Sequence, residues 1–93
     1  MREFIGEDII TLSRIADKMQ LKPDVDGKTQ QQIGAEFLIQ IFGKLHLADK
    51  EVWELVADLH GLKAEDVSKM PVRELKPLIR GIVTSADFAD FFK

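Results

Sequence analysis

Apolar residues recur every three or four positions along most of this chain, which is the spacing of an amphipathic α-helix. The first helix is predicted over about Glu7 to Gln20. Its apolar stripe consists of Ile5, Ile9, Leu12, Ala16 and Met19. Ile10 lies off this stripe, so we expect it to be exposed, either as an isolated surface isoleucine or as a contact for a partner. Pro23 and Gly27 then break the helix and predict a loop.

A second helix is predicted after a capping box, in which Thr29 and Gln32 each satisfy a backbone N–H at the helix start. Gly34 and Gly43 each cost about 1 kcal/mol relative to alanine inside a helix, a loss that close approach of another helix would offset. Apolar residues cover about two thirds of its circumference, so it must be covered on nearly all sides, by its own domain or partly by a neighbouring subunit. These residues are Ile33, Ala35, Phe37, Leu38, Ile39, Ile41, Phe42 and Leu45.

A third helix is predicted between Asp49, as its N-cap, and Gly61, which suits a left-handed C-terminal cap. Trp53 lies at the edge of its buried face. That face consists of Val52, Leu55, Val56 and Leu59. A short helix or turn is predicted over Ala64 to Met70, and Pro71 stops it or starts the next element.

The stretch from Val72 to Thr84 is also amphipathic, although Pro77 predicts a kink or a late helix start there. The inward residues are predicted to be Val72, Leu75, Leu78, Ile79, Ile82 and Val83, and the outward ones Arg73, Lys76 and Arg80.

The last predicted helix is capped by Ser85 and carries Phe88, Phe91 and Phe92 at i, i+3 and i+4, on one face. Chain ends are usually polar, so this aromatic face needs a partner. Either it closes the core of the domain, or it is offered to another chain.

No segment alternates apolar and polar residues in the manner of a strand, so the sequence predicts an all-α fold: a small single-domain helical bundle of about five to six helices over residues 1–93. The net charge of −3 disfavours nucleic acid as a partner. No apolar run approaches the ~18 residues of a membrane span, and no membrane partner is expected. The acidic N-terminal segment argues against a signal peptide, and the absence of cysteine favours the cytoplasm.

The sequence contains no group of residues typical of catalysis, so we expect no enzyme activity, catalytic residue, cofactor or metal. His46 and His60 match no zinc spacing, and helix-end histidines that interact with terminal carbonyls are the simpler interpretation. The segment Asp24-Val25-Asp26-Gly27 is similar to part of a calcium loop, but the ligands that should follow it are missing. A turn stabilised by aspartate side chains explains these residues.

Residues 55–70 resemble a helix-turn-helix, with Ala57, Gly61 and Val67 at matching intervals. A small DNA-binding regulator is therefore the alternative function. Against it, the second helix would present Glu65 and Asp66 to phosphate.

The chain resembles the tail assembly chaperones of long-tailed bacteriophages and prophages. The resemblance is carried by Asp58-Leu59-His60-Gly61-Leu62, Glu65-Asp66-Val67-Ser68-Lys69-Met70-Pro71, Glu74-Leu75 and Asp87-Phe88-Ala89-Asp90-Phe91-Phe92, together with the helix around Ile33 to Leu45. It implies a small helical protein, absent from the mature virion, that binds the tape measure protein in the host bacterial cytoplasm. Many members exist in a short and a frameshifted longer form, and this chain would be the short form.

A chaperone of this class needs apolar surface that holds a helical partner, and we also expect self-association. The candidate partner-binding residues are Ile39, Phe42, Trp53, Phe88, Phe91 and Phe92. Core packing is the alternative for each of them.

Overall fold

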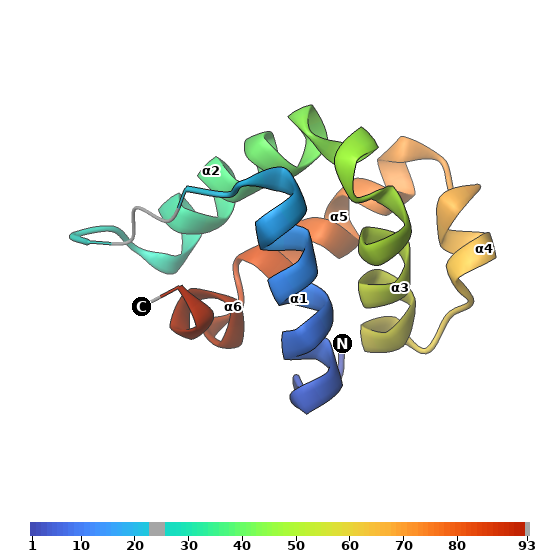
Figure 1. The fold of residues 1–93 in the computed structure, drawn as a ribbon, viewed down its shortest axis with the longest axis horizontal. Helices are drawn as coiled ribbons and strands as arrows, with labels where there is room; N and C mark the ends of the chain where they lie inside the picture. Colours follow the sequence, from blue (N-terminus) through green and yellow to red (C-terminus); the bar gives the residue numbers. More distant parts are fainter. Residues whose placement is uncertain (23–25, 93) are drawn as a thin grey trace.

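The computed structural model describes residues 1–22 and 26–92, and these ranges contain six α-helices, one short 3-10 helix and no strand (Figure 1). The elements are α1 (Gly6–Met19), α2 (Gln30–Gly43), η1 (Leu45–Leu47), α3 (Asp49–His60), α4 (Ala64–Ser68), α5 (Val72–Val83) and α6 (Ala86–Phe91). The prediction of an all-α fold is confirmed.

The helices pack as two neighbouring pairs around one core. α1 lies beside α3, and α2 lies beside α5, which crosses behind α1 in Figure 1. α4 covers the outer side of α3, while α6 packs against α2 and α5. The buried apolar side chains form one contiguous cluster. The Cα radius of gyration is 12.1 Å, and a compact domain of this length is expected to have about 12 Å.

The buried face of α1 differs from the predicted stripe. Leu12 and Met19 are buried as expected, but Ile5 is 53% exposed and Ile9 37% exposed, and Ile15 occupies the core instead. This difference arises because hydrogen bonds hold the carboxylate of Asp8 inward. The buried row of α1 therefore consists of Asp8, Leu12, Ile15 and Met19. Ile10, which the pattern placed off the stripe, is 55% exposed as expected.

The capping box at the start of α2 is confirmed, since Thr29 Oγ1 accepts from Gln32 N–H and Gln32 Oε1 accepts from Thr29 N–H. The expectation that glycine permits close helix approach holds for Gly34. A Cβ there would lie 2.4 Å from Thr84 Cγ2 and 3.0 Å from the carbonyl oxygen of Val83 on α5. It is wrong for Gly43, where a Cβ would meet nothing within 4 Å.

The start of α3 also differs from prediction, while its end is confirmed. Asp49 is the first helical residue, and Ala48 occupies the cap position. Asp49 therefore acts through its favourable charge in the first turn and not through a capping hydrogen bond. Gly61 ends the helix in the left-handed region with φ of +68°, which is the conformation that glycine adopts without strain.

Helix α5 begins at Val72, directly after Pro71 in the N-cap position, and continues through Pro77. Of the two alternatives predicted from Pro77, a kink or a late helix start, the late start is wrong. Val72, which the pattern placed inward, is 66% exposed because it lies in the first turn, beyond the part of α5 that packs on the core. Leu75, Ile79 and Ile82 are buried as predicted.

The aromatic residues of α6 pack against α2. Ser85 caps the helix by accepting from Phe88 N–H. The Phe88 ring meets Phe37 edge-on, with centroids 5.0 Å apart, and Phe92 stacks on Phe37 at 4.5 Å. Phe91 meets Phe92 edge-on at 4.8 Å. The aromatic face predicted from i, i+3 and i+4 spacing therefore closes the core of this chain.

Candidate functional site

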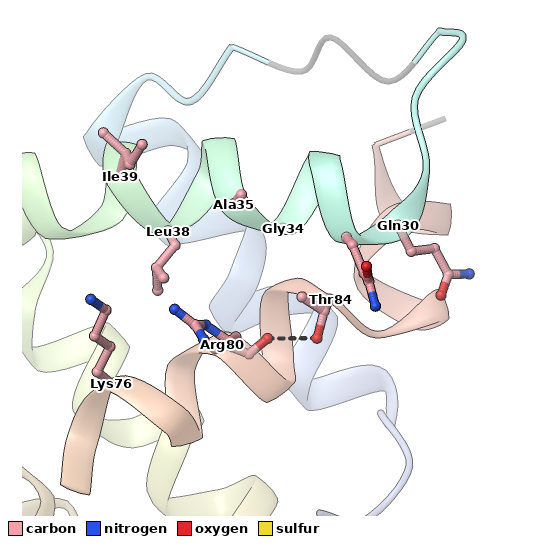
Figure 2. A pocket seen from close by; sticks show the side chains of 9 residues that line it. Gln30, Gly34, Ala35, Leu38, Ile39, Lys76, Arg80 and Thr84 are labelled. Atoms are coloured by element: carbon pink, nitrogen blue, oxygen red, sulfur yellow. Dashed lines mark hydrogen bonds between the residues drawn. The ribbon is translucent and has the colours of Figure 1, made fainter. Parts of the chain in front are cut away.

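An open groove of about 710 Å³ runs between α2 and α5 (Figure 2). The two helices are antiparallel here: Ile39 and Lys76 lie at one end of the groove, and Gly34 and Thr84 at the other. The close approach at Gly34 brings the helices together at that end, and the apolar side chains Ala35, Leu38 and Ile39 line the α2 side. Ile39 is 75% exposed, so α2 is not covered on nearly all sides by this chain.

The groove extends beyond Ile39 into a hollow of about 260 Å³. This hollow shares Leu38, Ile39 and Lys76 with the larger groove and adds Phe42 and Val72. We call the combined surface the α2–α5 groove. Proteins in water usually keep exposed apolar side chains apart from one another or cover them with a partner, and in this groove they lie together.

The α5 side of the groove is basic. Arg73, Lys76 and Arg80 are exposed, and none of them forms an ion pair with a carboxylate of the described residues. Among the residues that the structure describes, no aspartate or glutamate lines the groove or the hollows beside it. The groove therefore combines an apolar wall with unneutralised positive charge, in a chain whose net charge is −3.

The structure separates the predicted partner-binding residues into two groups. Ile39 and the half-buried Phe42 lie together in the α2–α5 groove. Phe88 is fully buried in the core, so its assignment to a partner surface is corrected.

The remaining predicted residues are half-buried and lie outside the groove. Phe91 and Phe92 belong to the aromatic cluster on α6, and Trp53 packs against the core from α3. The sequence pattern missed Val72, because it placed this residue on the inward face of α5 with the other apolar residues. It placed Arg73, Lys76 and Arg80 outward correctly but did not associate them with a groove.

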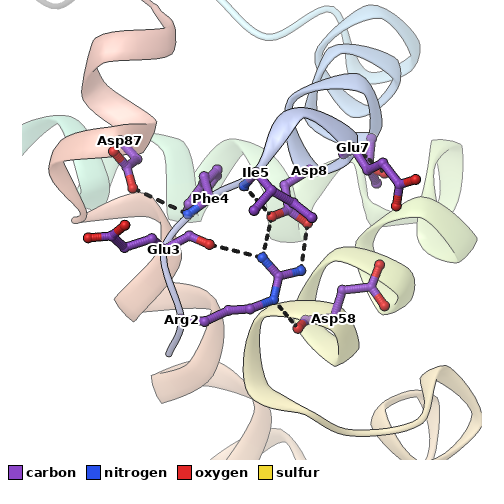
Figure 3. A network of polar contacts seen from close by, with 9 residues as sticks. Arg2, Glu3, Phe4, Ile5, Glu7, Asp8, Asp58 and Asp87 are labelled. Atoms are coloured by element: carbon purple, nitrogen blue, oxygen red, sulfur yellow. Dashed lines mark hydrogen bonds and ion pairs between the residues drawn. The ribbon is translucent and has the colours of Figure 1, made fainter.

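A second polar site joins the N-terminal segment to three helices (Figure 3). Two guanidinium nitrogens of Arg2 donate to the Asp8 carboxylate at 2.6 and 3.0 Å, and the backbone N–H of Ile5 donates to it at 2.8 Å. The Asp8 side chain is 2% exposed. The hydrogen bonds from Arg2 lower the pKa of Asp8, the Ile5 N–H acts in the same direction, and burial opposes them.

The same segment reaches the ends of α3 and α6. Arg2 Nε donates to the carbonyl of Asp58 at 2.9 Å, and the Arg2 backbone N–H donates to the carbonyl of Leu59 at 3.0 Å. The Phe4 N–H donates to the Asp87 carboxylate at 3.5 Å. Because every polar atom of Asp8 is engaged by the chain itself, this network is a structural clamp and offers no open position to a substrate.

The histidines form no metal site. Within residues 1–22 and 26–92, no group of three or more His, Cys, Asp or Glu side chains is placed to hold a metal ion. His60 lies in the last turn of α3, where burial lowers the pKa of its imidazole. In the calcium-like segment, Asp24 and Val25 lie outside the described residues.

The predicted helix-turn-helix corresponds to α3, the turn at Gly61 and α4. Ala57 and Val67 are buried between the two helices, which accounts for the sequence resemblance through packing alone. α4 has five residues and exposes Glu65 and Asp66 in its first turn. This surface is opposite in charge to one that binds phosphate.

The described part of the chain contains no helix with the length and apolar character needed to cross a bilayer. Comparison of the chain with protein-family models, curated proteins and solved structures finds no match in any of the three.

Proposed function

We propose that this protein is a non-enzymatic binding protein of the phage tail assembly chaperone class, which holds the tape measure protein in the host cytoplasm and is absent from the mature virion. The observation that carries the proposal is the α2–α5 groove, where Ile39 and Val72 are 75% and 66% exposed. A groove between two helices that presents aliphatic side chains is a common receptor for an amphipathic helix. Long helical proteins supply such segments repeatedly.

The test is co-expression with the tape measure protein encoded beside this chain, followed by affinity capture. The wild-type protein is expected to capture it. Ile39→Glu is expected to abolish capture, because a carboxylate in the centre of the apolar wall would be desolvated by the docked helix.

Ile10→Glu on α1 is the matched control. Ile10 is also an exposed helical isoleucine, at 55%, but it lies outside the groove, so this variant is expected to bind normally. Equal loss of capture in both variants, or no capture by the wild type, would contradict the proposal.

Self-association is a further part of the proposal. Ile5, at the N-cap of α1, and Ile9, four residues later, are both exposed, and a neighbouring copy would cover them. Sedimentation equilibrium over a range of concentrations measures this directly, and a strictly monomeric Ile9→Glu variant is the expected result.

The alternative function, a helix-turn-helix DNA-binding regulator, is supported only by the packing of α3 against α4. Binding of a DNA duplex whose affinity falls steeply with added salt would favour it over the chaperone.

A further inference from the structure

Two rows of side chains run along the α2–α5 groove, and each has a single chemical character. On α2, Ala35, Ile39 and Phe42 are spaced i, i+4 and i+7 and are apolar. On α5, the cations Arg73, Lys76 and Arg80 are spaced i, i+3 and i+7. Lys76 and Arg80 line the groove, and all three cations line a hollow on α5 that adjoins it. Each row covers two helical turns, about 10 Å along its axis. α2 and α5 lie side by side, and Figure 2 shows Lys76 and Arg80 of the α5 row beside the part of α2 that carries Ala35 and Ile39.

A helix that fits both rows must carry two rows of its own. Its apolar row, at i, i+3 or i+4, and i+7, would contact Ile39 and Phe42. A neighbouring row of carboxylates with the same spacing would face the cations of α5. Opposite charges placed in this way determine orientation and partner choice more than total affinity.

We propose that the α2–α5 groove selects an acidic amphipathic helix, in which a row of aspartates or glutamates flanks the apolar row. This inference rests on the proposed function and specifies the segment of the partner that is recognised. A helical partner with lysines at the same positions would be rejected by like-charge repulsion along α5.

The exposed isoleucine Ile10 on α1 does not offer such a helix to the groove of a second copy. On α1, Ile10 has Glu7 one turn before it and Arg14 one turn after it, so the row beside it carries mixed charge. A nucleic acid would use the cations of α5 but not the exposed aliphatic side chains Ile39 and Val72 beside them. The acidic amphipathic helix is the occupant that uses both rows.

The experiment uses a helix-constrained synthetic peptide of about three turns, with leucines at i, i+4 and i+7 and a glutamate directly after each leucine. A second peptide has lysines in place of the glutamates. Fluorescence anisotropy gives the dissociation constant of each peptide for the full chain at low and high salt. The glutamate peptide is expected to bind more tightly, and added salt is expected to reduce the difference.

The decisive variant reverses the charge of the cationic row, with Arg73→Glu, Lys76→Glu and Arg80→Glu together. Its affinity for the glutamate peptide is expected to be about tenfold weaker, the size expected for three exposed charge pairs, and the lysine peptide is expected to become the preferred ligand.

The matched control reverses three exposed lysines elsewhere, Lys50, Lys63 and Lys69, and so changes the net charge by the same amount. It is expected to retain the preference for the glutamate peptide. Circular dichroism checks the fold of each variant. If the charge-reversed variant of α5 fails to fold, it is replaced by a neutral one that combines Arg73→Gln, Lys76→Gln and Arg80→Gln. The neutral variant is expected to bind both peptides equally.

Equal binding of the two peptides by the wild type would overturn the inference, as would an equal effect of the two charge reversals. Binding of duplex DNA or of a second copy through the cationic row, without peptide binding, would also overturn it. The proposed function and this inference can be distinguished by capture of the tape measure protein. If Ile39→Glu abolishes capture but the charge reversal on α5 has no effect, the chaperone proposal is supported and the acidic-helix inference is contradicted.

Discussion

Replacement of Gly34 by alanine tests the contact between α2 and α5 that forms one end of the groove. In an isolated helix the change is favourable by about 1 kcal/mol. In this fold the new methyl group would lie 2.4 Å from Thr84 Cγ2, 3.0 Å from the Val83 carbonyl oxygen and 3.1 Å from Thr84 Cα. Two of these three atoms belong to the backbone, so relief requires movement of α5. Overpacking of this kind costs about 1–3 kcal/mol, so after the gain in helix propensity the net loss expected is up to about 2 kcal/mol.

Gly43→Ala is the matched control, because Gly43 is also a residue of α2 but has nothing within 4 Å of the position that the new methyl group would occupy. It is expected to gain between about 0.5 and 1 kcal/mol. The free energy of unfolding, measured by urea denaturation, should therefore move in opposite directions for the same chemical change.

The Thr84→Ser substitution separates the side-chain part of the clash from the backbone part. It removes Cγ2 but keeps the hydroxyl that donates to the Arg80 carbonyl at 2.7 Å. In the Gly34→Ala background it is expected to recover part of the lost stability, which a double-mutant cycle measures as a coupling free energy. Stabilisation by Gly34→Ala equal to that by Gly43→Ala would refute the close packing of α2 on α5.

Two further predictions concern the core and the N-terminal clamp. Phe88 is fully buried in contact with Phe37 and Phe92, so Phe88→Ala is expected to lower the free energy of unfolding by about 3–5 kcal/mol; a loss below about 1 kcal/mol would place α6 away from the core. Asp8 has a lowered pKa in the folded state, so its contribution to stability is present above the pKa of the unfolded chain and is lost as the pH falls through the folded value. In urea titrations across pH, Asp8→Asn is therefore expected to be less stable than the wild type at neutral pH and to lose less stability when the pH falls below about 4. If the free energy of unfolding of the two proteins fell equally at acidic pH, the assignment would be contradicted.

The features that the sequence predicted well are those determined by neighbours within one turn. The capping box at Thr29, the cap at Ser85 and the left-handed end at Gly61 depend only on local geometry, and all three occur. The buried face of α1 could not be predicted in this way. Asp8 turns inward because Arg2, outside the helix, neutralises it, and a search for apolar periodicity does not record such a pair.

The groove was only partly predictable for a related reason. The outward direction of Arg80 and the breadth of the apolar face around Ile39 follow from each helix alone. That these two surfaces meet along one groove depends on the packing of α2 against α5 at Gly34, which is a property of the folded chain.

The N-terminal clamp also has a consequence for folding during synthesis. The Phe4 N–H bonds to Asp87, 83 residues further along, and the Arg2 side chain bonds to a carbonyl 56 residues away. At ribosomal rates of about 5–20 residues per second, roughly 4 to 17 seconds pass between the synthesis of Phe4 and that of its partner. Phe4 can therefore form this bond only after Asp87 in α6 has been made, so closure of the clamp follows the synthesis of helices α1 to α5.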